Sequence, residues 1–167
     1  MVMYHDPLRQ LRETFESARG LYETGKFAEA LQALEEIPAP YQASPDILEF
    51  RCHLYLAAKE WSLAAALAQR LAETNPKEPG HWISWAFAVR RLDSIEAAEK
   101  ILLDATTRHP ACATIHFNLA CYAAQTGRLP LAATRLQEAI RLEPRMAHQA
   151  AEDPDLLPLF QNPDQAV

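Results

Sequence analysis

Cys112, His116 and Cys121 are the residues of this sequence whose types come nearest to a metal-binding set. Cys112 and His116 are four positions apart, so they would share one face of a helix. A tetrahedral zinc site needs four ligands, usually in closely spaced pairs, and the sequence lacks that spacing. We therefore expect small packed cysteines and a histidine on the helix surface, with no bound metal and no cofactor.

The other groups able to do chemistry form no catalytic pattern. The sequence contains no phosphate-binding loop and no GxSxG, HExxH or CxxC motif. Its acidic pairs, such as Glu35 with Glu36 and Asp153 with Asp155, fall where helix ends or loops are expected, and solvation accounts for them. These observations predict a protein that is not an enzyme. The histidines are dispersed at His5, His53, His81, His109, His116 and His148.

The overall charge and hydropathy of the chain exclude further classes of function. The 167 residues carry a net charge of −6 and contain no block of lysine and arginine, so we expect no binding to nucleic acid. No segment approaches the roughly 20 apolar residues of a membrane helix, and residues 1–10 lack the pattern of a signal peptide. The odd number of cysteines favours free thiols in a reducing compartment. The sequence thus predicts a cytoplasmic protein.

Helices are the elements that must position these side chains. Alanine and leucine are abundant while β-branched residues are sparse, which favours helices over strands. Apolar residues recur at helical spacing over 8–22 and again over 27–37. The cleanest example covers 116–144, where two helical segments are separated by a turn at Gly127 and closed by a proline.

The same unit recurs along the chain at a fixed spacing of 34 residues. Two columns of this repeat contain only small residues, one only large residues, and one only proline. Helical proteins without internal repeats do not keep such a phase over four units, so the sequence predicts a repeat protein. The columns are Ala30, Ala64, Ala98 and Ala132; Ala18, Cys52, Ala86 and Ala120; Phe27, Trp61, Ile95 and Leu129; and Pro76, Pro110 and Pro144.

This period and these columns resemble the tetratricopeptide repeat (TPR), with Trp82, Trp85, Ala86, Ala98 and Pro110 in one repeat. The resemblance implies an all-α fold, a right-handed superhelical solenoid of about four antiparallel helix pairs with a capping helix at the C-terminus. We expect a single TPR-like domain over residues 1–161. Its repeats are placed at 11–44, 45–78, 79–112 and 113–146, and its cap at 147–161.

Two parts of the chain depart from the repeat. Arg51 occupies a column that carries large apolar residues elsewhere, and we expect it to snorkel or to pair with a carboxylate such as Glu16. The pattern decays after Pro144, yet residues 156–160 are too apolar for a solvated tail. We expect them to fold back as a cap over the last repeat, the alternative being insertion into a neighbouring molecule. Residues 162–167 are predicted to be disordered.

The resemblance also implies a binding surface, because the first helices of TPR units line a concave groove that takes peptides or helices of other proteins. Phe87 and Phe117 would face this groove from helices that are apolar on two sides, so the second face is either buried or binds something. The alternative is that the chain's own termini cover part of it. By column, the predicted groove residues are Arg12, Phe15, Arg19, Tyr22, Glu49, His53, Ile83, Phe87, Arg90, Phe117, Asn118 and Cys121.

The predicted function is therefore a non-catalytic interaction module, an adaptor or scaffold that binds a protein or peptide partner. Two alternatives stay open: a chaperone for a secreted or aggregation-prone client, and a homo-oligomeric assembly protein. The TPR proteins that clamp a chaperone's C-terminal carboxylate do so with lysine, asparagine and arginine. Only one basic residue occupies the matching positions, so that subclass is disfavoured. Those positions hold Phe15, Arg19, Phe50, Gly80 and Ser84.

Overall fold

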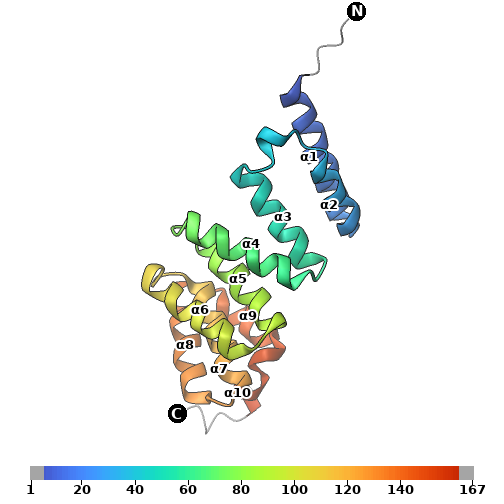
Figure 1. Cartoon of the computed structure of the whole chain (residues 1–167). Helices are drawn as coiled ribbons and strands as arrows, with labels where there is room; N and C mark the ends of the chain where they lie inside the picture. The colour runs from blue at the N-terminus through green and yellow to red at the C-terminus, as the bar shows by residue number, and fades with distance from the viewer. Residues whose placement is uncertain (1–5, 162–167) are drawn as a thin grey trace, which may run out of the picture.

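The computed structural model describes residues 6–161, and every regular element among them is helical. Four antiparallel helix pairs follow one another as a right-handed solenoid, which Figure 1 shows stepping from α1 and α2 at one end to α7 and α8 at the other. None of the described helices is both long and apolar enough to span a bilayer. The pairs are α1 (Pro7–Glu23) with α2 (Phe27–Glu35), α3 (Pro45–Ala57) with α4 (Trp61–Thr74), α5 (Pro79–Leu92) with α6 (Ile95–Arg108), and α7 (Ala113–Gln125) with α8 (Leu129–Leu142).

Short elements connect the first two pairs and complete the C-terminal end. A 3₁₀ turn, η1 (Ala39–Tyr41), joins α2 to α3, and the chain after α8 forms α9 (Met146–Glu152), η2 (Pro154–Leu156) and α10 (Leu157–Gln161). The η2 turn packs on α7, and α10 packs on α7 and α8. The prediction that the chain folds back over its last helix pair is therefore confirmed. The predicted disorder of residues 162–167 lies outside the described residues.

Helix ends follow the local chemistry of the sequence. Asp6 caps α1 by accepting a hydrogen bond from the backbone N–H of Leu8 at 3.1 Å, and Pro7 occupies the first helical position. The α2 helix ends early, before two prolines. There Gln42 stands where later units carry proline, and its Nε2 donates to the backbone oxygens of Glu35 and Ile37, both at 3.0 Å. The glutamine thus satisfies carbonyls that the helix end leaves open.

The turn within each pair needs a left-handed residue in three of the four cases. Gly25 and Gly127 have φ of 75° and 76°, and Lys59, at the same position of the 34-residue unit, has a φ of 61°. A lysine in this region is strained because its Cβ approaches the backbone. Asp93 occupies this position in the third pair with a φ of −127°. The turn of the third pair is therefore formed without a left-handed residue at this position.

Small residues allow the helices of each pair to pack closely. All four members of the alanine column at 30, 64, 98 and 132 are fully buried, and the members of the column at 18, 52, 86 and 120 are at most 3% exposed. A larger side chain at these positions would overpack the helix contact, at a cost of about 1–3 kcal/mol. The two small columns therefore set the spacing of the helices that carry the groove.

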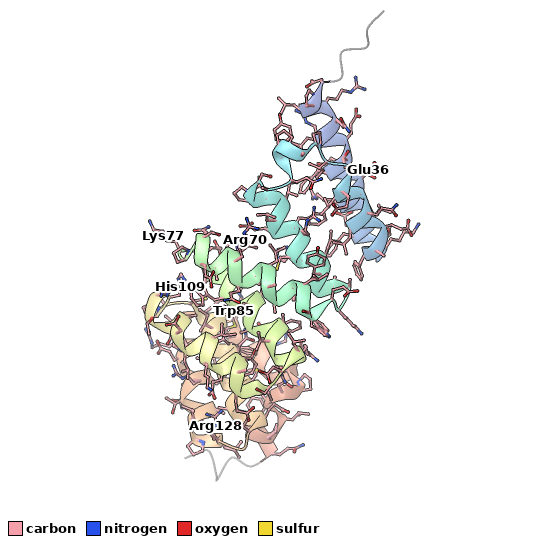
Figure 2. All side chains as sticks on the ribbon, in the orientation of Figure 1. Glu36, Arg70, Lys77, Trp85, His109 and Arg128 are labelled. Carbon is pink, nitrogen blue, oxygen red and sulfur yellow. The ribbon has the colours of Figure 1, made fainter. Side chains whose placement is uncertain are left out.

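The hydrophobic core is unevenly distributed along the solenoid. One large cluster runs from Ala72 to Leu159 and includes most of α7, while the N-terminal helices form three smaller clusters. Trp85 packs against the large cluster and two of the smaller ones, and Figure 2 shows it within the stack of helices. This side chain therefore couples the middle pairs to the C-terminal pair.

Arg51 finds a different partner from the one predicted. Its guanidinium pairs with the carboxylate of Glu35 on α2, while Glu16 pairs with Arg19 on its own helix at 3.8 Å. Because α3 packs on α2, the acidic residue nearest to Arg51 comes from the helix before it in the chain. The Arg51 side chain is only 14% exposed, so the ion pair lies at the edge of the core.

Candidate functional site: the first-helix groove

The groove is the face that the first helices α1, α3, α5 and α7 turn away from their second helices. Each first helix carries one small buried residue, and because successive residues lie about 100° apart around a helix, the residues next to it in the chain point to other faces. These small residues are Ala18, Cys52, Ala86 and Ala120. The structure divides this face into three clefts between successive first helices. They differ in chemistry, and only two of them are open.

The first cleft, between α1 and α3, is apolar. It encloses a cavity of about 290 Å³ whose lining includes Leu8, Leu11, Phe15 and Ile47, with Arg12 at its edge. Leu8 is 57% exposed, although a leucine gains about 1.5–3 kcal/mol from full burial. The cleft is thus an apolar surface without a covering element among residues 6–161.

Aromatic rings extend this surface along α1 and α3. Phe15 meets Phe50 edge to face with ring centroids 5.2 Å apart, and Tyr22 meets the same ring at 5.7 Å. Tyr22 stays 37% exposed and also contacts Phe27. Of the predicted groove residues in the first pair, Phe15 and Tyr22 therefore share one aromatic cluster, while Arg12 and Arg19 are exposed beside it.

The second cleft, between α3 and α5, carries carboxylate and imidazole groups among largely apolar walls. Glu49 and His53 line it from α3, and Ile83 lines it from α5. The buried ring of His81 also faces it, and Nε2 of His81 lies 3.0 Å from Oε1 of Glu49. Predicted groove residues from two helix pairs thus meet around one cavity.

Phe87 lies further along α5 and is 40% exposed. Its ring packs edge to face on Trp61, with centroids 6.0 Å apart, and the guanidinium of Arg91 stacks over it at 5.2 Å. One face of the ring is therefore supported by the protein while much of its surface remains open. The sequence indicated Trp61 only as a member of the large-residue column, and its contact with Phe87 is seen in the structure.

The third cleft, between α5 and α7, is filled by the chain itself. Residues 153–161, here called the C-terminal segment, lie on α7, and Phe117 and Cys121 are only 2% and 3% exposed beneath this part of the fold. Leu156 and Leu159 of the segment are equally buried, at 0% and 5%. For the fourth helix pair, the alternative that the chain covers its own groove face is the one found.

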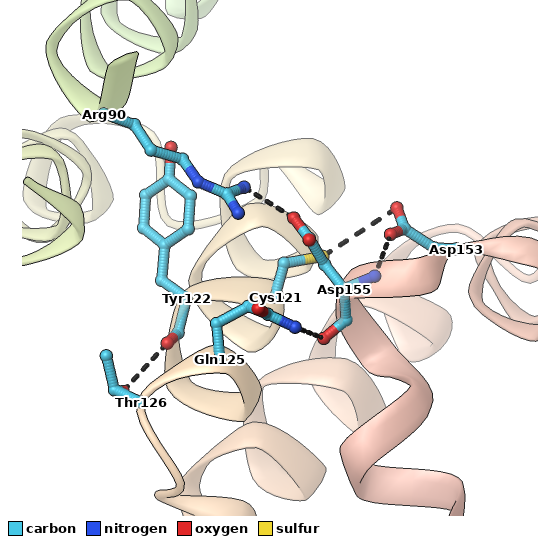
Figure 3. A network of polar contacts seen from close by, with 7 residues as sticks. All are labelled: Arg90, Cys121, Tyr122, Gln125, Thr126, Asp153 and Asp155. Carbon is cyan, nitrogen blue, oxygen red and sulfur yellow. Dashed lines mark hydrogen bonds and ion pairs between the residues drawn. The ribbon is translucent and has the colours of Figure 1, made fainter. Parts of the chain in front are cut away.

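Polar contacts hold the C-terminal segment in place (Figure 3). Arg90 of α5 pairs with Asp155 at 2.5 Å and stacks over the ring of Tyr122 at 5.2 Å. The side chain of Gln125 donates a hydrogen bond to the backbone oxygen of Asp155 at 2.9 Å. The hydrogen bond with Asp155 raises the pKa of Arg90. Arg90 is therefore committed to an internal ion pair, although the sequence placed it on the open groove.

One group of possible metal ligands occurs in the described residues, and it differs from the one considered in the sequence. Ligand atoms of Cys121, Asp153 and Asp155 lie within 4.8 Å of one another. Burial, and then the two aspartates, raise the pKa of the Cys121 thiol to about 12, while Asp155 is already paired with Arg90. The arrangement favours a protonated thiol and an ion pair over a metal centre.

His116 is buried, contrary to the prediction of a surface histidine. Its Nε2 donates to the backbone oxygen of Pro110 at 2.9 Å, and its Nδ1 accepts from Arg135 at 3.4 Å. Both ring nitrogens are thus engaged within the protein. Cys112, four residues earlier, is half-buried and precedes α7 as its capping residue.

Sequence reasoning missed several residues of the site. Leu8 lies before the first predicted unit, although its helical spacing from Leu11 and Phe15 placed it on the same apolar stripe. His81 gave no signal, because a lone histidine near a helix start has no distinctive pattern. Asp155 was interpreted as a solvated loop residue, since nothing in the sequence indicates that Arg90 lies opposite.

Comparison with known proteins supports the fold and little beyond it. No protein-family model matches the sequence. No curated protein matches it either. The structure is similar to TTC0263, a TPR protein of Thermus thermophilus, with a TM-score of 0.70 and 20% identity over 92% of this chain and 83% of that one.

Two further solved structures give the same result. MamA of Desulfovibrio magneticus RS-1, from residue 41 to its end, has a TM-score of 0.71 at 15% identity over 94% of this chain and 87% of that one. YrrB, described as a TPR protein with an unusual peptide-binding site, has a TM-score of 0.66 at 16% identity over 84% and 73%. The protein is thus TPR-like, a helical-repeat solenoid with the fold of the TPR proteins.

Proposed function

We propose that this protein is a non-catalytic scaffold that binds a peptide or helix of a partner protein along the groove face of its first three helix pairs. The fold supports an interaction scaffold in general, since the similar structures are TPR proteins and one of them is described by its peptide-binding site. A reducing compartment such as the cytoplasm suits the three free cysteines.

One observation carries the proposal: apolar and aromatic side chains remain exposed on the first helices while their counterparts on α7 are covered. Leu8, Tyr22 and Phe87 are 57%, 37% and 40% exposed. Large exposed apolar groups that gather on one face mark interaction sites in monomeric proteins. A partner side chain inserted against Phe15 or Phe87 would bury both surfaces, and such aromatic anchors dominate many interfaces.

The charged residues beside the groove would orient the partner. Arg12 lines the first cleft and Glu49 lines the second, while Arg19 is exposed on α1. Such rim charges act mainly on association rate and register. Arg90, Phe117 and Cys121 are left out of the proposed binding surface, because the C-terminal segment contacts or covers them. Asn118, on the same covered helix, is left out with them.

The test is the exchange of Phe87 for glutamate, with affinity capture of the partner by the tagged full-length chain in its native host. Because Phe87 is 40% exposed, Phe87→Glu should keep the helical circular dichroism signal and reduce partner capture at least tenfold. Leu103→Glu is the matched control: Leu103 is also 40% exposed but lies on α6, a second helix.

Capture should survive in the Leu103→Glu variant. Equal capture by both variants would contradict the proposed groove. Loss of helicity in Phe87→Glu would mean that Phe87 is part of the core, and it would remove this residue from the binding surface.

A further inference from the structure

The cleft between α3 and α5 is a cavity of about 370 Å³ with an unusual lining. Its polar side chains include Glu49, Glu78 and His81, while Leu71 and Ile83 supply apolar wall. The volume lies within the range of about 300–1,000 Å³ found for pockets that hold small ligands or inserted groups. The cavity is therefore large enough to admit one long side chain.

The charge of this cavity is negative. Neither Glu49 nor Glu78 forms an ion pair with a lysine or arginine in residues 6–161, and no residue of either type lines the cavity. Arg70 lines a neighbouring hollow that shares Glu49 and His81 as its wall. Two carboxylates without a lysine or arginine partner give the cleft a field that attracts positive charge.

His81 adds to this chemistry. Its side chain is buried, and its Nε2 lies 3.0 Å from Oε1 of Glu49. Because a carboxylate can only accept, the proton of a neutral imidazole must be on Nε2, which makes Nδ1 an acceptor. Nδ1 is buried and has no hydrogen-bond partner among the described residues. A buried polar atom left unpaired costs about 1–3 kcal/mol and calls for an explanation.

The position of Glu49 in the repeat supports a role in binding. At the same position, the other three helix pairs carry Phe15, Ile83 and Phe117, all apolar. A single carboxylate interrupts this otherwise apolar column, and within residues 6–161 only its Oε1 is engaged, by the ring of His81. Its neighbour across the cleft, Glu78, uses Oε1 to accept from the backbone N–H of Gly80 at 3.1 Å and so is held at the cavity wall.

We propose that this cleft is a subsite for a lysine or arginine side chain of the bound partner, received by Glu49 and Glu78. The inference rests on the proposed function, since it assigns the chemistry of one part of the same groove. The methylene stem would lie on Leu71 and Ile83, and the charged head would donate hydrogen bonds to the carboxylates. A cationic donor suits the carboxylate oxygens of Glu49 and Glu78 and the Nδ1 of His81, which is unpaired among the described residues.

The adjoining cleft offers a positive charge instead of a negative one. Between α5 and α7, Arg90 receives Asp155 of the acidic C-terminal segment. That segment would meet like charge at Glu49 and Glu78 if it extended into the next cleft. The two clefts therefore select opposite charges, and the chain's own segment fills only the basic one.

An array of 12-residue peptides tests this subsite, with the central position fixed as arginine, lysine, glutamine or glutamate in an otherwise mixed sequence. Labelled full-length protein should bind the arginine and lysine sets at least tenfold better than the glutamine set. Glu49→Gln and Glu78→Gln together should reduce this preference below twofold. Each glutamine keeps an oxygen that can accept from His81 or Gly80, so both variants should remain folded by circular dichroism.

Glu96→Gln is the control, because Glu96 is exposed on α6, outside the cleft. It should leave the preference intact. Peptides that bind without preference for a basic residue would overturn the subsite and leave the proposed function standing. Binding of free spermidine, measured by calorimetry, without any peptide preference would overturn it in favour of a small cation. If no peptide binds at all, both the subsite and the proposed groove function fail.

Discussion

The helices α1 and α7 occupy the same place in their respective pairs, yet their surroundings differ greatly. Of the 17 residues of α1 only Ala18 is buried, whereas ten of the 13 residues of α7 are. The first helix packs against α2, while α7 is enclosed by α8, α6 and the C-terminal segment. Whether a first helix presents a groove or a core therefore depends on the segment that comes after the repeats in the chain.

This difference divides the groove face into two regions with different roles. The N-terminal region, with Leu8, Phe15 and Tyr22 on α1, keeps apolar surface open. In the C-terminal region the equivalent surface belongs to the largest hydrophobic cluster among residues 6–161. We expect the C-terminal region to stabilise the solenoid and the N-terminal region to bind the partner.

The largest effect should come from truncating the two groove phenylalanines. Phe117→Ala removes a ring that is 2% exposed, so the free energy of unfolding should fall by about 3–5 kcal/mol. Phe87→Ala removes a ring that is 40% exposed, and the loss should be about 1–2 kcal/mol. Urea unfolding followed by circular dichroism measures both. Equal losses would show that the two regions are packed alike.

A smaller effect should appear at alkaline pH. Burial raises the pKa of Cys121 and Tyr122 in α7 to about 12 and that of Cys52 in α3 to about 11. A folded-state pKa above the unfolded value means that the folded protein holds its proton more tightly. The stability that each thiol contributes is therefore complete below about pH 9 and is lost as the pH rises toward its folded pKa.

Replacing the thiols one at a time sharpens the comparison of the two regions. In both Cys121→Ala and Cys52→Ala, the free energy of unfolding should fall less steeply between about pH 9 and pH 11 than in the wild type. Comparing slopes removes the constant loss of stability caused by the small cavity that each substitution leaves. The wild-type slope retained in both variants would contradict the burial of these thiols.

The sequence was sufficient to predict the fold because its signals are local and periodic. The helices α6 (Ile95–Arg108) and α8 (Leu129–Leu142) begin at members of the large-residue column and end two residues before Pro110 and Pro144 of the proline column. The fold-back of Leu156 and Leu159 was also predicted, because apolar residues beyond the last repeat need a surface to cover.

The side-chain contacts within the groove, and the segment that covers part of it, could not be predicted in the same way. They depend on contacts between residues far apart in the sequence. Arg90 and Asp155 are 65 positions apart, and no sequence pattern around either residue indicates that the two are in contact. The repeat column predicted Phe117 on the groove face, but a column carries no information about the chain that covers this face. The pairing of Glu49 with His81, across 32 positions, is hidden for the same reason.

Hydrogen exchange of the full-length protein, alone and with the best-binding peptide of the array, tests the central claim most directly. In both states the amides of α7 and of the C-terminal segment should exchange slowly, and the peptide should add protection only on α1, α3 and α5. The claim would be contradicted if the peptide protected α7 and accelerated exchange in residues 153–161. That result would make the segment a displaceable occupant of the groove rather than a fixed part of the core.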